Sequence, residues 1–71
     1  MSSARPSSSE LAAVAAADLA EALRVEGNAF FRDGAFASAE ARYSAAVDAD
    51  PQNARAHCNR GMARKALGRF P

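Results

Sequence analysis

Two side chains that could bind an anionic group lie four residues apart in one predicted helix. Arg24 and Asn28 stand at positions i and i+4, so both present hydrogen-bond donors from the same helix face. A carboxylate accepts charge-assisted hydrogen bonds from such donors, and asparagine donates without adding a charge that must be desolvated. The pair therefore suits capture of a peptide's terminal carboxylate and of an acidic side chain beside it. The alternative is structural: an arginine paired with Glu21 and an asparagine facing solvent.

Other reactive side chains lack the partners that catalysis needs. His57 lies beside Cys58, but adjacent helix residues point about 100° apart, so this histidine is badly placed to activate the thiol. The serines near the start of the chain also lack a catalytic partner. Cys58 is the one cysteine, which excludes an internal disulfide, and no Cys and His residues have metal-binding spacing. We expect no enzyme, no cofactor and no metal site, and we expect Cys58 to be a half-buried packing residue.

Length and charge limit the classes of partner. The chain has 71 residues, enough for at most one small domain, and its net charge of +1 is spread over interspersed charges of both signs. Neither nucleic acid nor a membrane surface is favoured as a partner. The run "LAAVAAA" is flanked by Glu10 and Asp18, which argues against a secretory signal, and no stretch is long enough to cross a bilayer. We expect a cytoplasmic protein in a reducing compartment.

The bounds of the first helix are predicted from its cap and its end. Ser7 followed by Glu10 has the form of a capping box, and an alanine-rich run without proline continues to Asp33. Gly34 follows the last periodic residue and suits the positive φ of a helix end.

A second glycine stands inside this helix, where it costs about 1 kcal/mol relative to alanine. Gly27 lies on the side that holds Leu19, Leu23 and Phe30 at helical spacing. We therefore expect Gly27 at a helix crossing, where its missing side chain lets a neighbouring helix approach, with Leu19 on the packed side.

Two further helices are predicted after Gly34. The first runs from about Phe36 to Ala49, with large and small residues alternating on one face as close antiparallel packing requires. The segment "DADPQN" then breaks the chain, because proline cannot continue a helix, and Asp50 or Asn53 can cap the next one. The last helix is predicted from Ala54 to Leu67.

The chain contains an internal repeat. The four glycines form two pairs with one offset of 34 residues, Gly27 with Gly61 and Gly34 with Gly68. Six positions follow the order large apolar, glycine, aromatic, alanine, aromatic, proline: Leu23, Gly27, Phe30, Ala39, Tyr43 and Pro51. In this order and spacing the chain resembles the tetratricopeptide repeat (TPR) family. It departs from the signature at Glu26, where leucine is preferred, and at His57 and Arg64 of the second repeat.

The resemblance implies an all-α fold, a fragment of a TPR helix-turn-helix solenoid. It places one full repeat at residues 20–53 and a truncated second repeat at 54–71, preceded by a Ser/Ala-rich extension. Within that extension we expect a disordered tail at 1–9 and a helical segment at 10–19. In such families the first helices of successive pairs line a concave groove.

A narrower resemblance concerns the TPR domains of heat-shock co-chaperones, which bind chaperone C-termini through a carboxylate clamp. Arg24, Asn28 and Asn59 match three clamp positions, with Arg24 in place of the usual lysine. The helix that supplies the remaining basic pair has no counterpart. Phe31, one turn after Asn28, is a candidate groove contact, although core packing is an equal alternative. The implied ligand is the acidic Glu-Glu-Val-Asp tail of 70-kDa and 90-kDa heat-shock proteins.

The resemblance leaves other roles open and makes one expectation about stability. The chain could instead be a TPR scaffold for another protein partner, or a non-binding part of a larger enzyme such as an isomerase or phosphatase. The third helix should be bare on one side, with apolar atoms of Met62, Leu67 and Phe70 facing water. We therefore expect marginal stability, weak self-association through this helix, and a fragment or short isoform of a longer protein.

Overall fold

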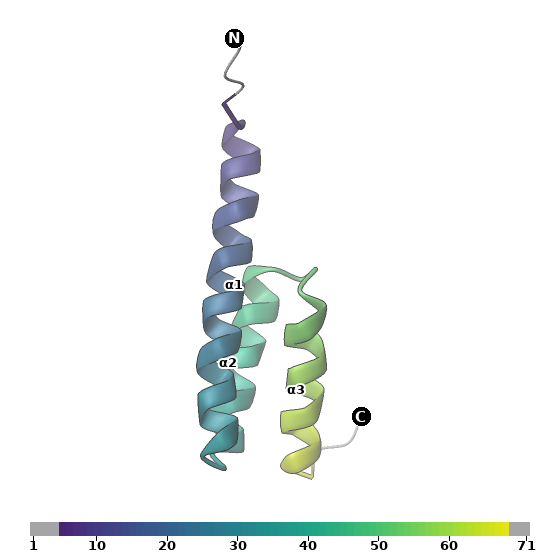
Figure 1. Cartoon of the computed structure of the whole chain (residues 1–71). Coiled ribbons are helices and arrows are strands. Elements are labelled where there is room, and N and C mark those ends of the chain that lie inside the picture. Colours follow the sequence, from purple (N-terminus) through teal and green to yellow (C-terminus); the bar gives the residue numbers. More distant parts are fainter. Residues whose placement is uncertain (1–4, 69–71) are drawn as a thin grey trace.

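All regular secondary structure in the described part of the chain is helical. The structure is a computed structural model that describes residues 5–68. Its three helices are α1 (Ser8–Arg32), α2 (Phe36–Ala49) and α3 (Ala54–Ala66). Helices α1 and α2 form an antiparallel hairpin, α3 runs antiparallel to α2, and the N-terminal half of α1 extends past both (Figure 1). The predicted all-α fold is confirmed.

The start of α1 follows from its capping box. The Ser7 hydroxyl oxygen accepts from the Glu10 backbone N–H at 3.1 Å, and the Glu10 carboxylate accepts from the Ser7 backbone N–H at 3.2 Å. With Ser7 as the N-cap, the first helical residue must be Ser8. Residues 8 and 9 are therefore helical, which corrects the prediction of a disordered tail at 1–9 for these two positions. Residues 1–4 lie outside the described residues.

The C-terminal ends of α1 and α3 and the start of α3 also use residues that the sequence indicated. Gly34 follows α1 with φ +79°, and Gly68 follows α3 with φ +76°. Asn53 caps α3, because its side-chain oxygen accepts from the Ala56 backbone N–H at 3.0 Å. Helix α3 ends at Ala66, and Leu67, predicted as its last residue, is the C-cap. Gly34 and Gly68, which are 34 residues apart, thus have the same structural role at the ends of α1 and α3.

The core is built mainly from alanines in two clusters. Ala20 of α1 packs with Ala46 and Val47 of α2 and with Ala56 of α3. A second cluster joins the buried residues Ala39, Tyr43 and Ala63, with Phe30 and Phe31 packed against it. Tyr43 is the largest fully buried side chain among the described residues, with 2% of its surface exposed. Such a small core is typical of closely spaced helices, in which each large side chain needs a small residue opposite.

Leu19 does not lie on the packed side of α1. Its side chain is 55% exposed, and the buried residue at this level is Ala20. The reason is rotational: α2 ends opposite Ala20, so the adjacent residue points about 100° away from the contact. The prediction for Leu19 is therefore wrong, whereas Leu23 packs against the core as expected.

Two further expectations concern α3. Cys58 is exposed rather than half-buried, because the buried face of α3 is centred on Ala56 and Ala63 and Cys58 lies on the other side. Met62 is 52% exposed, as the sequence predicted, and Leu67 is half-buried. Phe70 lies outside the described residues. Within residues 5–68, no helix combines the length and the apolar character that crossing a bilayer requires.

Gly27 lies at the helix crossing that the sequence predicted. A Cβ atom built on Gly27 would stand 2.5 Å from Cε1 and 2.7 Å from Cδ1 of the Tyr43 ring, closer than two carbon atoms can approach. At Gly61, its counterpart in the repeat, a Cβ atom would meet nothing within 4 Å. The same residue type thus has a packing role in α1 that it lacks in the described structure around α3.

Candidate functional site

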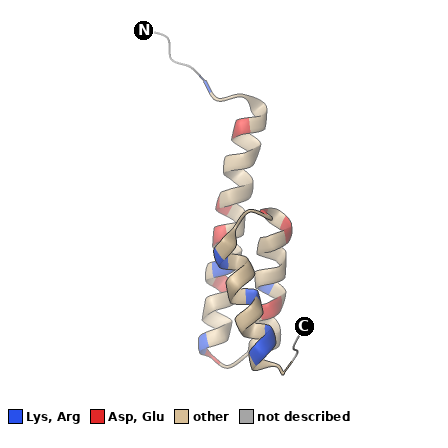
Figure 2. Ribbon diagram, turned by 90° about the vertical axis from the view of Figure 1, so that its right-hand side faces the viewer, with Lys and Arg blue, Asp and Glu red and all other residues tan. Residues whose placement is uncertain are grey.

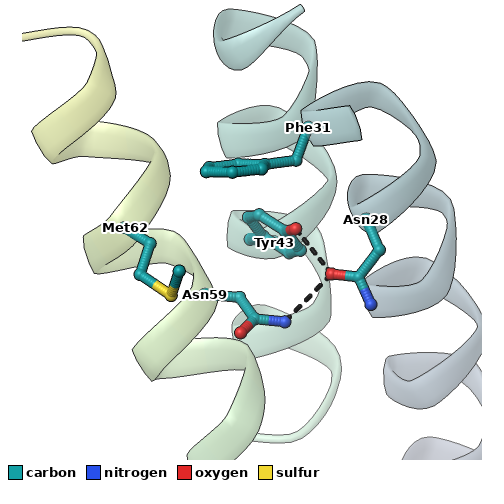
Figure 3. A pocket seen from close by; sticks show the side chains of 5 residues that line it. All are labelled: Asn28, Phe31, Tyr43, Asn59 and Met62. Carbon is teal, nitrogen blue, oxygen red and sulfur yellow. Dashed lines mark hydrogen bonds between the residues drawn. The ribbon is translucent and has the colours of Figure 1, made fainter. Parts of the chain in front are cut away.

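A small pocket lies where the three helices meet beside Tyr43 (Figure 3). Its walls come from all three helices: Asn28 and Phe31 of α1, Tyr43 of α2, and Asn59 and Met62 of α3. The lining combines apolar side chains, a tyrosine hydroxyl and two side-chain amides. Asn28, Asn59 and Phe31, which the sequence singled out, are thereby brought to one place.

Two hydrogen bonds hold the Asn28 side chain. Its oxygen Oδ1 accepts from the Tyr43 hydroxyl at 2.6 Å and from Nδ2 of Asn59 at 3.1 Å (Figure 3). These bonds use both lone pairs of the oxygen and so determine which way the amide faces. Nδ2 of Asn28 has no hydrogen-bond partner among residues 5–68, and no buried side-chain nitrogen or oxygen in that range lacks one. Nδ2 is therefore a solvent-accessible, pre-oriented donor.

Tyr43 helps to hold the Asn28 side chain in this orientation. Its ring fills the space that Gly27 leaves open, which brings the hydroxyl to the neighbouring Asn28. Burial raises the pKa of the Tyr43 hydroxyl, although the positive charges of Arg24 and Arg32 oppose the shift. The hydroxyl thus stays protonated over the physiological range and continues to donate to Asn28.

Arg24 lies one turn before Asn28 but does not line the pocket. Its Nε donates to both Glu21 carboxylate oxygens at 3.1 Å, and its Nη2 donates to Oε1 of the same residue. This hydrogen bonding raises the pKa of Arg24 and, with a smaller contribution from Asn53, lowers the pKa of Glu21 to about 2. The pairing with Glu21 that the sequence offered as the structural alternative is therefore present.

Glu21 also joins two parts of the fold. Besides holding Arg24, its Oε2 accepts from Nδ2 of Asn53 at 3.2 Å. Asn53 is the cap of α3, so Glu21 connects α1 to the start of that helix. Sequence spacing could suggest the i, i+3 pair with Arg24, but not this contact across 32 positions.

Phe31 takes part both in the pocket lining and in the packing of the fold. It lines the pocket, and its ring also meets the Phe36 ring edge-on, with centroids 5.0 Å apart and an angle of 66° between the ring planes. An edge-to-face pair of this kind holds the ring in place. Phe31 is therefore a fixed apolar wall of the pocket as well as part of the packing.

The remaining reactive side chains stay apart from the pocket. The His57 ring nitrogen Nε2 lies 2.8 Å from the carbonyl oxygen of Pro51 in the α2–α3 loop. Among residues 5–68, no three His, Cys, Asp or Glu side chains are grouped to hold a metal ion. Helices α1 and α2 carry charged residues of both signs, whereas those of α3 are all basic: Arg55, Arg60, Arg64 and Lys65 (Figure 2).

Tyr43 and Met62 line the pocket although the sequence did not single them out as site residues. Met62 lies three residues after Asn59 and so shares its helix face, a signal that was available. For Tyr43 the signal was weaker: an aromatic residue opposite a helix glycine indicates packing, and only the structure places its hydroxyl on Asn28.

A helical hairpin is followed by a third helix, and glycines 34 residues apart end α1 and α3. This arrangement is that of a helical-repeat protein. A model of the TPR repeat matches residues 27–68, more than half of the chain, and the chain belongs to the TPR family. TPR repeats are protein-interaction motifs, so this chain is a protein-interaction module. No curated protein and no solved structure matches the chain significantly.

Proposed function

We propose that this module is a co-chaperone-like adaptor that binds the acidic C-terminal peptide of a 70-kDa or 90-kDa heat-shock protein in the pocket. The observation that carries the proposal is the fixed Asn28 amide, whose Nδ2 donor is free while its oxygen is held by Tyr43 and Asn59. A donor held in place before binding loses little side-chain entropy when the ligand arrives.

Different groups of the proposed ligand contact the polar and the apolar parts of the site. Its terminal carboxylate accepts from Nδ2 of Asn28, and an acidic oxygen lies toward the guanidinium of Arg24 one turn away. Glu21 uses the Nε hydrogen and one Nη2 hydrogen of Arg24, so Nη1 still has its donors. Phe31 and Met62 supply the wall for the ligand's apolar side chain.

We predict weak binding that depends on a free C-terminus. A labelled Glu-Glu-Val-Asp peptide titrated into the chain should bind about tenfold more tightly than the same peptide with an amidated C-terminus, because a hydrogen bond to a charged group contributes about 1.5–3 kcal/mol. Fluorescence anisotropy measures both affinities.

Two outcomes would contradict the proposal and point to the alternatives. Equal affinity for the free and amidated peptides would remove the carboxylate from recognition and favour a scaffold for another protein partner. No binding of either peptide would favour a non-binding part of a larger enzyme.

A further inference from the structure

Glu21 places a carboxylate of the protein itself on the cation that the proposed site offers to an acidic ligand. Three hydrogen bonds join it to Arg24, and the Glu21 side chain is 45% exposed at this position whereas that of Arg24 is only 14% exposed. A ligand that approaches Arg24 from solvent therefore meets a carboxylate already bound there. The guanidinium retains unused donors, but its positive charge is largely neutralised.

The pair also has a structural partner that limits how Glu21 can move. Asn53 donates to the Glu21 carboxylate at 3.2 Å and so holds it from the α2–α3 loop. Glu21 is thus fixed from two sides, by Arg24 of its own helix and by the cap residue of α3. A carboxylate held in this way stays beside the guanidinium when a ligand arrives, so it continues to neutralise the charge of Arg24.

We propose that Glu21 is a built-in competitor of the ligand's carboxylate and sets how strongly the pocket favours acidic peptides. This inference rests on the proposed function, because it concerns the same site. Removing the charge of Glu21 strengthens binding of an acidic peptide, since Arg24 then offers its full charge. The residue acts through Arg24 and touches no ligand, so it is a positioning and specificity residue rather than a direct contact.

The test compares Glu21→Gln with a matched control on the same helix. Glutamine keeps an oxygen that can accept from Asn53, so the link to α3 is retained. Glu26→Gln makes the same change of charge at a position whose nearest cation is Arg42 of α2, 4.0 Å away, and whose side chain is 55% exposed. We expect Glu21→Gln to bind the Glu-Glu-Val-Asp peptide about two- to fivefold more tightly than the wild type, and Glu26→Gln to leave the affinity unchanged.

A second pair of variants shows whether the effect passes through Arg24. In an Arg24→Gln background, adding Glu21→Gln should give no gain, because the interaction energy of the pair is then absent. The gain in peptide affinity of the Glu21→Gln variant should also become smaller at high salt. Thermal melts followed by circular dichroism check that every variant keeps the fold.

The outcomes separate the two proposals. If the wild type binds the peptide and Glu21→Gln binds it equally or more weakly, or if Glu26→Gln gains as much, the role of Glu21 is overturned and the proposed function stands. If neither the wild type nor Glu21→Gln binds, the proposed function fails and this inference fails with it.

Discussion

Replacing Gly27 with alanine should destabilise the chain, whereas the same replacement at Gly61 should stabilise it. The Cβ atom at position 27 would stand 2.5 Å from a carbon of the Tyr43 ring, and that ring is buried and held through its hydroxyl by Asn28. Overpacking of this kind costs about 1–3 kcal/mol, which exceeds the gain of about 1 kcal/mol from helix propensity for most of that range. At Gly61 the new methyl group meets nothing within 4 Å, so the gain stands alone.

The measurement is the free energy of unfolding of the two variants in urea, relative to the wild type. We expect a difference of about 1–3 kcal/mol between Gly27→Ala and Gly61→Ala, with opposite signs relative to the wild type. Stabilisation in both variants would show that Tyr43 moves aside at little cost, and the close approach of α1 and α2 would then not depend on this glycine.

Replacing Asn28 with aspartate should abolish most binding of an acidic peptide while preserving the pocket. Aspartate keeps an oxygen that accepts from the Tyr43 hydroxyl and from Nδ2 of Asn59. It lacks the Nδ2 donor and adds a negative charge where the ligand carboxylate is proposed to lie. Affinity for the Glu-Glu-Val-Asp peptide should fall by at least about tenfold, since a charge-assisted hydrogen bond is lost and repulsion is added.

Gln52→Glu is the matched control for this variant. It makes the same change of charge on the exposed α2–α3 loop, outside the pocket. Anisotropy titrations should show nearly unchanged affinity for Gln52→Glu. A similar loss of affinity in both variants would show that the effect is due to net charge alone. No loss of affinity in Asn28→Asp would mean that the Asn28 amide does not contact the peptide.

The helices could be predicted from the sequence because their ends depend on local chemistry. The Ser7–Glu10 capping box and the glycine at position 34 act within a few residues of themselves, and the structure has both. Leu19 shows where local reasoning fails. Helical spacing alone cannot tell how α1 is rotated about its axis against α2, and that rotation decides whether Leu19 or Ala20 faces the core.

The site was predictable in part for the same reason. Asn28 and Asn59 could be selected by their resemblance to carboxylate-clamp positions. Their hydrogen bond joins residues 31 apart and depends on how α1 and α3 are rotated about their axes. Pairing of Arg24 with Glu21 was one of two interpretations open from the sequence, and spacing could not decide between them. The contact of Glu21 with Asn53 had no sequence signal, because it depends on the path of the α2–α3 loop.

The central claim is that the carboxylate of an acidic peptide binds the Asn28 amide, which Asn59 holds in place. It is tested most directly by the side-chain amide signals of the protein. The chain has only four such groups: Asn28, Gln52, Asn53 and Asn59. In a two-dimensional 15N NMR titration with the Glu-Glu-Val-Asp peptide, the side-chain NH2 signals of Asn28 and Asn59 should shift progressively while that of Gln52 stays in place. Binding that shifts Gln52 and leaves Asn28 and Asn59 unmoved would contradict the account.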